Sequence, residues 1–252
     1  MKKFICLLAI LMLGACSSDD NNDSEDFGGN IPAEEKFLNS FSTGTGTISL
    51  IYNNDKTVKR LTLSFNESGA YIFDFKYTNG NVSQVTGIIG GNSGTIYFQH
   101  QNNVITGFRY EGDDLFTQLQ YNAQTNAYTF IEDDEEYLID LTESGDLEKY
   151  YSEDEYTAEA NCVLLYDEDD DKFGNMTNTN NIHPYIALVF PQMATFMGLF
   201  SKKPLNTISV NQATMQCENQ YYNDGFLKST YAAFGQDGQT YTYKYTTIQD
   251  TE

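Results

Sequence analysis

The chain of 252 residues contains 14 basic and 36 acidic residues, which gives a formal net charge of −22. This charge argues against binding to nucleic acid and against electrostatic adhesion to anionic lipid, because both of those partners are themselves negative. Tyrosine (19) and phenylalanine (17) are abundant, while proline is scarce at 4 and tryptophan is absent. This composition is typical of many strands joined by tight turns, so we predict a mainly all-β protein.

The first residues have the organisation of a secretion signal. Lys2 and Lys3 precede an apolar segment, 4–13, which is too short to span a bilayer as a permanent helix. The sequence LGAC at 13–16 follows and resembles the lipobox of bacterial lipoproteins. The resemblance implies cleavage before Cys16 and acylation of its thiol, so 1–15 are predicted to be a lipoprotein signal peptide. The alternative is an ordinary signal peptide with a chance cysteine.

The segment 16–31 is predicted to be the lipidated cysteine and a disordered acidic tether, because it contains almost nothing that can be buried. Loss of 1–15 removes two lysines and no acidic residue, so the charge changes from −22 to −24. Attachment to the membrane is therefore expected through the acyl chains on Cys16 alone. The acidic start resembles the surface-export signal of Bacteroidetes-type lipoproteins, which implies the outer membrane and the cell surface. The periplasmic face, with a plain solvated spacer, is the alternative.

Residues 32–252 are predicted to form a single β-rich domain. From about residue 47 onward, apolar and polar residues alternate with a period of two, as in strands with one buried face. The Asn79-Gly80 pair between two such segments is a strong hairpin signal, because both turn positions require positive φ. Turn residues recur at short intervals, including 102–103, 112–114 and 144–146. The pattern predicts an antiparallel meander of hairpins forming one strongly curved sheet or a partly closed barrel.

The most apolar stretch of the mature chain is 185–200, which Pro191 and Gly198 interrupt. It is too short to cross a membrane, and we predict one or two short helices that pack on the sheet. Its aromatic side chains form either part of the core or a patch for an apolar ligand. The aromatic stripe at 71–77 has the same two interpretations, and core is the favoured one. The candidate patch residues are Tyr185, Phe190, Phe196 and Phe200.

Two sequence patterns resemble known families. The octapeptide FKYTNGNV at 75–82 resembles the tyrosine-rich hairpin repeats of Rhs and YD-repeat proteins. Further along, YD at 166–167, the apolar stretch, NDGF at 223–226 and a hairpin with alternating tyrosines follow in an order that resembles uncharacterised Bacteroidetes outer-membrane lipoproteins. The chain departs from that family at 172–174, where KFG stands in place of Asn-Pro-Phe. The resemblance implies a fold and a location but no activity.

Cys162 and Cys217 are the cysteines that remain after Cys6 leaves with the signal and Cys16 is acylated. In an oxidising envelope compartment they could form a disulfide that closes a long loop. Both lie in predicted strands, so the alternative is two small buried hydrophobic residues.

The sequence offers few groups for catalysis or metal binding. Its two histidines, His100 and His183, are interpreted as ordinary loop or edge residues. No motif for a nucleophile or a zinc site is present, and we expect no enzymatic activity and no cofactor. The one metal candidate is calcium, because alternate carboxylates can converge on a hard cation. The sequence around these residues does not match the EF-hand loop template. A solvated acidic turn is therefore the favoured interpretation. The candidate ligands are Asp167, Asp169 and Asp171.

Three hypotheses for function follow. The leading one is a non-catalytic envelope lipoprotein whose curved sheet binds a protein or a glycan. The second is a carrier that holds an apolar ligand inside the sheet near 185–200. The third is a glycan-acting enzyme that uses a pair of carboxylates.

Overall fold

The computed structural model describes residues 36–65, 69–89, 91–152, 161–169, 173–174, 182–210, 213–234 and 237–248. The predicted signal peptide, the predicted tether with Cys16, and Asp171 of the acidic turn lie outside these residues. The described part contains 17 strands and three short helical segments. The first nine strands are β1 (Phe37–Thr43), β2 (Gly46–Tyr52), β3 (Val58–Phe65), β4 (Gly69–Thr78), β5 (Asn81–Ile89), β6 (Asn92–Gln101), β7 (Val104–Tyr110), β8 (Thr117–Gln118) and β9 (Gln120–Asn122). The others are β10 (Ala127–Glu132), β11 (Glu135–Leu141), β12 (Leu147–Ser152), β13 (Asn161–Tyr166), β14 (Leu205–Val210), β15 (Ala213–Tyr221), β16 (Leu227–Phe234) and β17 (Asp237–Thr246).

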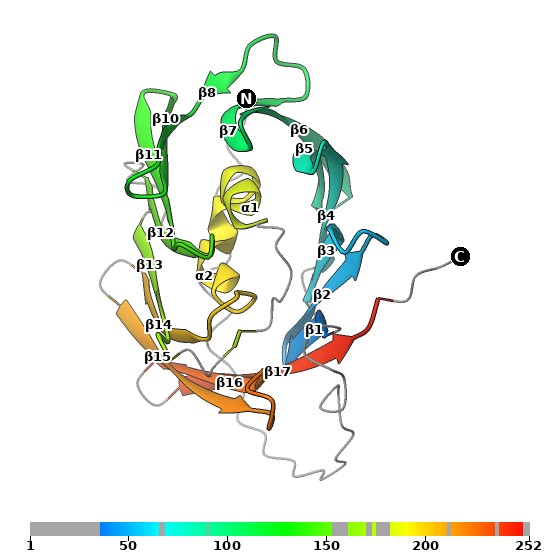
Figure 1. The fold of residues 1–252 in the computed structure, drawn as a ribbon, viewed down its shortest axis with the longest axis vertical. Helices are drawn as coiled ribbons and strands as arrows, with labels where there is room; N and C mark the ends of the chain where they lie inside the picture. Colours follow the sequence, from blue (N-terminus) through cyan, green and yellow to red (C-terminus); the bar gives the residue numbers. More distant parts are fainter. Residues whose placement is uncertain are drawn as a thin grey trace.

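The strands form one antiparallel meander that closes on itself. Strands that follow one another along the chain pair with one another. The short strands β8 and β9 are separated by Leu119 alone, and they pair with β7 on one side and β10 on the other. Because β1 pairs with both β2 and β17, the two ends of the sheet meet (Figure 1). The predicted meander is confirmed, and its pairings make a barrel.

Strand β1, which closes the ring, was not predicted from the sequence. A β-bulge between Leu38 and Ser40 shifts its register against β17. As a result Leu38 and Phe41 are both buried although they are three positions apart. A bulge breaks the strict alternation that marks a strand, which explains why the pattern gave no signal here.

The helical segments fill the barrel. They are α1 (His183–Val189), η2 (Pro191–Met193) and α2 (Ala194–Met197), and they lie inside the ring of strands (Figure 1). The prediction of one or two short helices is confirmed. Their place is the interior of the barrel, because only there is an apolar segment covered on all sides. Among the described residues, no helix has the length and apolar character needed to cross a membrane.

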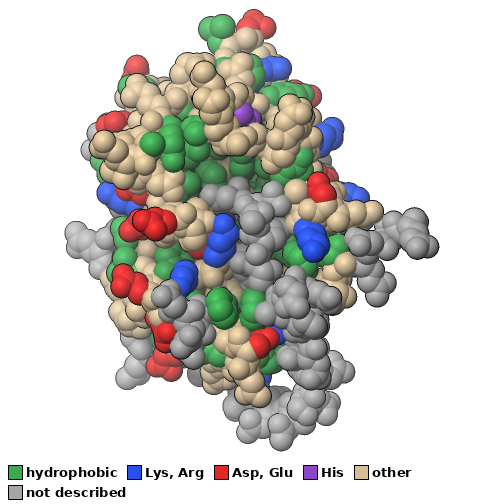
Figure 2. All heavy atoms as spheres, in the orientation of Figure 1, with side chains coloured by type: hydrophobic (Ala, Val, Ile, Leu, Met, Phe, Trp, Pro, Cys, Tyr) green, Lys and Arg blue, Asp and Glu red, His purple; other side chains and the backbone are tan. Residues whose placement is uncertain are grey.

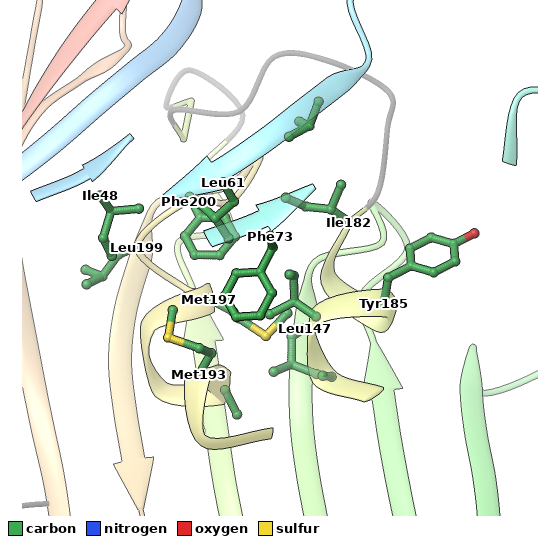
Figure 3. Packing of buried hydrophobic residues seen from close by; sticks show 14 of the residues in the cluster. Ile48, Leu61, Phe73, Leu147, Ile182, Tyr185, Met193, Met197, Leu199 and Phe200 are labelled. Carbon is green, nitrogen blue, oxygen red and sulfur yellow. The ribbon is translucent and has the colours of Figure 1, made fainter. Parts of the chain in front are cut away.

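The barrel interior is a packed core rather than an open channel. Met193 of η2, Met197 of α2 and Phe200, which follows α2, have 0% exposure. They gather with Phe73 of β4 and Leu147 of β12, which come from different parts of the wall (Figure 3). We refer to residues 182–201 as the plug. Large apolar side chains buried in this way each contribute about 1.5–3 kcal/mol, so the plug is expected to be a major source of stability.

The strands turn polar side chains outward. In β3, Val58, Leu61 and Leu63 are buried while Lys59 and Ser64 are exposed. Figure 2 shows hydrophobic side chains gathered in the upper part of the visible face, with charged side chains both around its outline and across its middle. Strands that face lipid have the opposite arrangement, with apolar side chains outward. Among the described residues, the large apolar side chains that are exposed lie in separate segments: Ile51, Leu115, Ile131, Leu165 and Phe173.

No disulfide joins Cys162 and Cys217 in the structure. Cys162 lies in β13 and Cys217 in β15, and β14 runs between them. Two strand spacings of about 4.8 Å exceed the Cα separation that a disulfide tolerates. Cys162 is fully buried, and burial raises the pKa of Cys217 to about 11. Cys162 therefore has the environment of a small buried hydrophobic residue, while Cys217 is half-buried against the core.

Candidate functional site

A pocket of about 370 Å³ opens at the end of the barrel where several hairpin turns meet. Its lining comes from the β4–β5, β6–β7 and β9–β10 turns, from the β11–β12 loop and from the start of α1. We refer to it as the mouth pocket. These segments are far apart in the sequence and come together only because the barrel closes around the plug.

The turns place asparagine side chains at this end of the barrel. Asn103 and Asn126 line the mouth pocket, and both have positive φ, of 64° and 53°. Asparagine tolerates the left-handed conformation better than most residues, so it suits tight turns. Asn81, from the neighbouring hairpin, donates from Nδ2 to Oδ1 of Asn103 at 3.0 Å. The residues that shape the turns therefore also supply amide groups to the pocket.

Tyrosine rings form much of the pocket wall. Tyr121 and Tyr128 are opposite each other on β9 and β10, and their ring centroids are 4.9 Å apart. The hydroxyl of Tyr121 donates to Oδ1 of Asn126 at 2.8 Å. Tyr77 donates from its hydroxyl to the carbonyl of Val58 at 2.8 Å. These bonds fix the rings before any ligand arrives, which lowers the entropic cost of binding.

The fourth tyrosine of the wall, Tyr185, comes from the plug. It is 7% exposed, its hydroxyl lies 2.9 Å from Nε2 of His100, and its ring meets Phe98 edge-on at 5.0 Å. Burial raises the pKa of Tyr185 and lowers the pKa of His100, so both groups are neutral near pH 7. Tyr185 therefore lines the pocket as one member of an uncharged hydrogen-bonded pair, whose other member, His100, lies behind it.

Charged groups stand at the rim. Glu143 and Lys202 both line the mouth pocket. The backbone N–H of Lys202 donates to both carboxylate oxygens of Asp146, at 3.0 and 3.1 Å, and its ammonium donates to the carbonyl of Ser144. Glu143 is the one carboxylate among the described residues that line the pocket. Glycoside hydrolysis generally requires two carboxyl groups, and the described residues that line the pocket supply one of them.

The remaining residues of the predicted patch lie in the core. Phe200 stacks on Phe41 of β1 with ring centroids 6.4 Å apart. Phe190 lies between Tyr71 and Phe73, with centroids at 5.5 and 5.6 Å. Phe196 is half-buried against the same core. Of the candidate patch, Tyr185 alone lines the mouth pocket.

His183 corrects the interpretation made from the sequence. It is the first residue of α1 and is 3% exposed, so it is neither a loop nor an edge residue. The N–H of Leu147 donates to its Nδ1 at 2.7 Å, and its Nε2 donates to the carbonyl of Phe200 at 2.8 Å. Burial lowers its pKa, while the nearby Asp146 opposes that shift in part. His183 therefore joins the plug to the wall as a neutral imidazole.

The structure describes two of the three candidate calcium ligands. The N–H of Asp169 donates to Oδ1 of Asp167 at 3.1 Å, as in a local turn. The described residues, which do not include Asp171, contain no cluster of three or more potential metal ligands. Calcium binding at this turn stays a prediction.

Comparison with known proteins gives a distant structural similarity. No protein-family model matches the chain, and no curated protein matches its sequence. A porin-like protein from Bacteroides vulgatus has 10% identity and a TM-score of 0.40, over 83% of this chain and 99% of that one. A porin-like protein from Bacteroides uniformis has 13% identity and a TM-score of 0.41, over 83% of this chain and 98% of that one. At this sequence identity and TM-score, the similarity assigns no activity to this chain. Its resemblance to YD-repeat hairpins and Bacteroidetes lipoproteins stays a prediction.

Proposed function

We propose that this protein is a non-catalytic, lipid-anchored envelope protein that binds a small carbohydrate at the mouth of its barrel. The mouth pocket carries the proposal, because it combines four tyrosine rings with three asparagine amides in about 370 Å³. That volume lies within the range of small-molecule sites.

The chemistry of the lining favours a carbohydrate over an apolar ligand. A sugar has C–H faces that pack on aromatic rings and hydroxyl groups that hydrogen-bond to amides and carboxylates. Tyrosine offers both an apolar face and a polar tip. Asn81, Asn103 and Glu143 add donors and acceptors at the rim. A carrier of an apolar molecule would need an apolar cavity, and the plug occupies the centre of the barrel.

The envelope location is supported by the sequence and by the outer face of the barrel. The lipobox resemblance at 13–16 supplies an anchor at Cys16. The outward side chains are polar on strands such as β3, so attachment through acyl chains suits this barrel better than burial of its wall in lipid. We propose that the protein is anchored in the outer membrane with its domain on the cell surface. The alternative location of the domain is the periplasmic face of that membrane.

Calorimetric titration with a panel of mono- and oligosaccharides tests the proposed site. We expect Tyr121→Ala to weaken binding about tenfold or more, because it removes an aromatic wall. Asn103→Ala is expected to weaken binding about fivefold to tenfold through loss of a hydrogen-bonding amide.

Two matched variants serve as controls. Tyr151→Ala and Asn92→Ala remove the same side chains from strands β12 and β6, outside the mouth pocket. They should bind as the wild type does. Equal losses in all four variants, or no binding across the panel, would contradict the proposal.

A further inference from the structure

Lys36, the residue that immediately precedes β1, is held in a cage of aromatic rings. The ammonium of Lys36 lies 5.0 Å from the ring centroids of Tyr222 and Phe226 and 5.2 Å from that of Tyr245. It also lies 2.6 Å from Oδ2 of Asp224. The side chain of Lys36 has 0% exposure, and that of Asp224 has 27%. A fully desolvated cation is therefore surrounded by three rings and one carboxylate.

The walls of this cage are shaped by bonds within β15–β17. The N–H of Tyr222 donates to the carbonyl of Phe226 at 2.8 Å, which closes the β15–β16 turn. The N–H of Phe226 donates to Oδ1 of Asp224 at 3.2 Å, so the carboxylate is oriented by its own turn. The hydroxyl of Tyr245 donates to the carbonyl of Leu227 at 2.7 Å. None of these bonds involves Lys36, so the lysine is not needed to make them.

The physical chemistry of the cage suits an alkylammonium ion. Attraction between a cation and aromatic faces strengthens when water is removed. The carboxylate of Asp224 compensates the buried charge, which would otherwise be strongly unfavourable. A neutral group of the same shape would gain neither interaction, so the cage distinguishes an ammonium from an alcohol.

We propose that Tyr222, Asp224, Phe226 and Tyr245 form an ammonium-binding site, which Lys36 occupies so as to fix the register in which β1 closes the barrel. In the native register Phe37 is opposite Thr246 and Leu38 is opposite Tyr245. A slip of β1 by two residues would preserve the inward and outward faces of the strand. It would also withdraw Lys36 from Asp224, leaving a buried cage without its cation, so the lysine selects one register over the other.

Chemical rescue of the variant Lys36→Ala tests this site. In the full chain we expect the ratio of folded to unfolded protein to fall on the order of 100-fold, because one partner of a buried ion pair is lost. Added n-butylammonium should then raise the melting temperature in a saturable way and restore slow hydrogen exchange of the β1 amides. Added n-butanol should do neither. If Lys36→Ala does not fold alone, refolding in n-butylammonium should recover it.

Three further variants make the outcome decisive. Lys36→Met fills the cage with a neutral chain, so it should fold and show no response to n-butylammonium. Lys36→Ala combined with Asp224→Asn should lose the rescue. Arg60→Ala breaks the exposed pair with Asp74, whose side chains are 42% and 34% exposed, and should show little loss and no rescue. Wild-type stability in Lys36→Ala, or equal effects of butanol and butylammonium, would overturn the proposal.

Discussion

Replacing Cys16 with alanine is expected to move the protein from the membrane pellet to the supernatant and to abolish incorporation of labelled fatty acid. Each buried methylene of an acyl chain contributes roughly 0.8 kcal/mol to membrane attachment, so two or three chains hold a protein almost permanently. With a net charge of −22, the chain has no electrostatic attraction to anionic lipid that would replace them. Fractionation together with fatty-acid labelling measures both effects.

Cys162→Ala is the control for the anchor variant, because Cys162 is a buried residue of β13 and does not belong to the lipobox sequence at 13–16. It should be labelled and pelleted like the wild type. Acylation that persists in Cys16→Ala, or continued pelleting of that variant, would count against the anchor. Protease treatment of whole cells then distinguishes the cell surface from the periplasmic face.

Replacing His183 with alanine is expected to lower the free energy of unfolding by about 3 kcal/mol or more. The change leaves the N–H of Leu147 and the carbonyl of Phe200 buried without their present partner. Each unsatisfied buried group costs about 1–3 kcal/mol, and the lost ring adds a cavity. Urea unfolding measures the effect. His100→Ala, which removes a half-buried histidine, should cost clearly less, and equal losses would contradict the structural role of His183.

Because His183 is buried, we expect the free energy of unfolding to depend on pH. Burial lowers the pKa of His183 in the folded protein, whereas in the unfolded chain it is about 6.5. Above that pH neither state binds the proton, so His183 adds no pH dependence. As the pH falls below about 6.5, the unfolded state takes up a proton that the folded state does not, and stability decreases by up to about 1.4 kcal/mol per pH unit.

Comparison of the wild type with His183→Gln isolates this effect, since the carboxylates contribute equally to both proteins. The difference in their unfolding free energies should shrink as the pH falls from about 7 to about 5, because only the wild type carries this destabilising protonation. A difference that stays constant over that range would show that His183 does not resist protonation.

Much of the barrel follows from local rules of sequence. Asn79 and Gly80 adopt positive φ, as the hairpin signal requires, and the strands on either side pair as β4 and β5. The interruptions at Pro191 and Gly198 divide the apolar stretch into short helical pieces. Closure of the barrel was not predictable in this way. It depends on the pairing of β1 with the distant β17, and the bulge in β1 obscures the alternating pattern that marks a strand.

The candidate site was predictable only in part. Tyr185 belongs to the apolar stretch that the sequence indicated, and it lines the mouth pocket. Asn103 and Asn126 are typical turn residues. Their local sequence does not show whether a turn only connects two strands or also faces a pocket. In the sequence, Lys36 lies shortly after the predicted tether. The residues of its cage come from the distant segment β15–β17. Such sites depend on contacts between distant segments, which a period-two pattern does not encode.

Methyl NMR of the carbohydrate-free protein, titrated with the saccharides that bind best in calorimetry, tests the central claim most directly. Four methyl-bearing residues line the mouth pocket: Val82, Val104, Ile105 and Leu141. Three others are exposed on the outer side of the strands: Ile51, Ile131 and Leu165. We expect saturable shifts in the pocket methyls and unchanged signals on the outer side. Shifts confined to the outer methyls, or none in either set, would contradict a carbohydrate site at the mouth of the barrel.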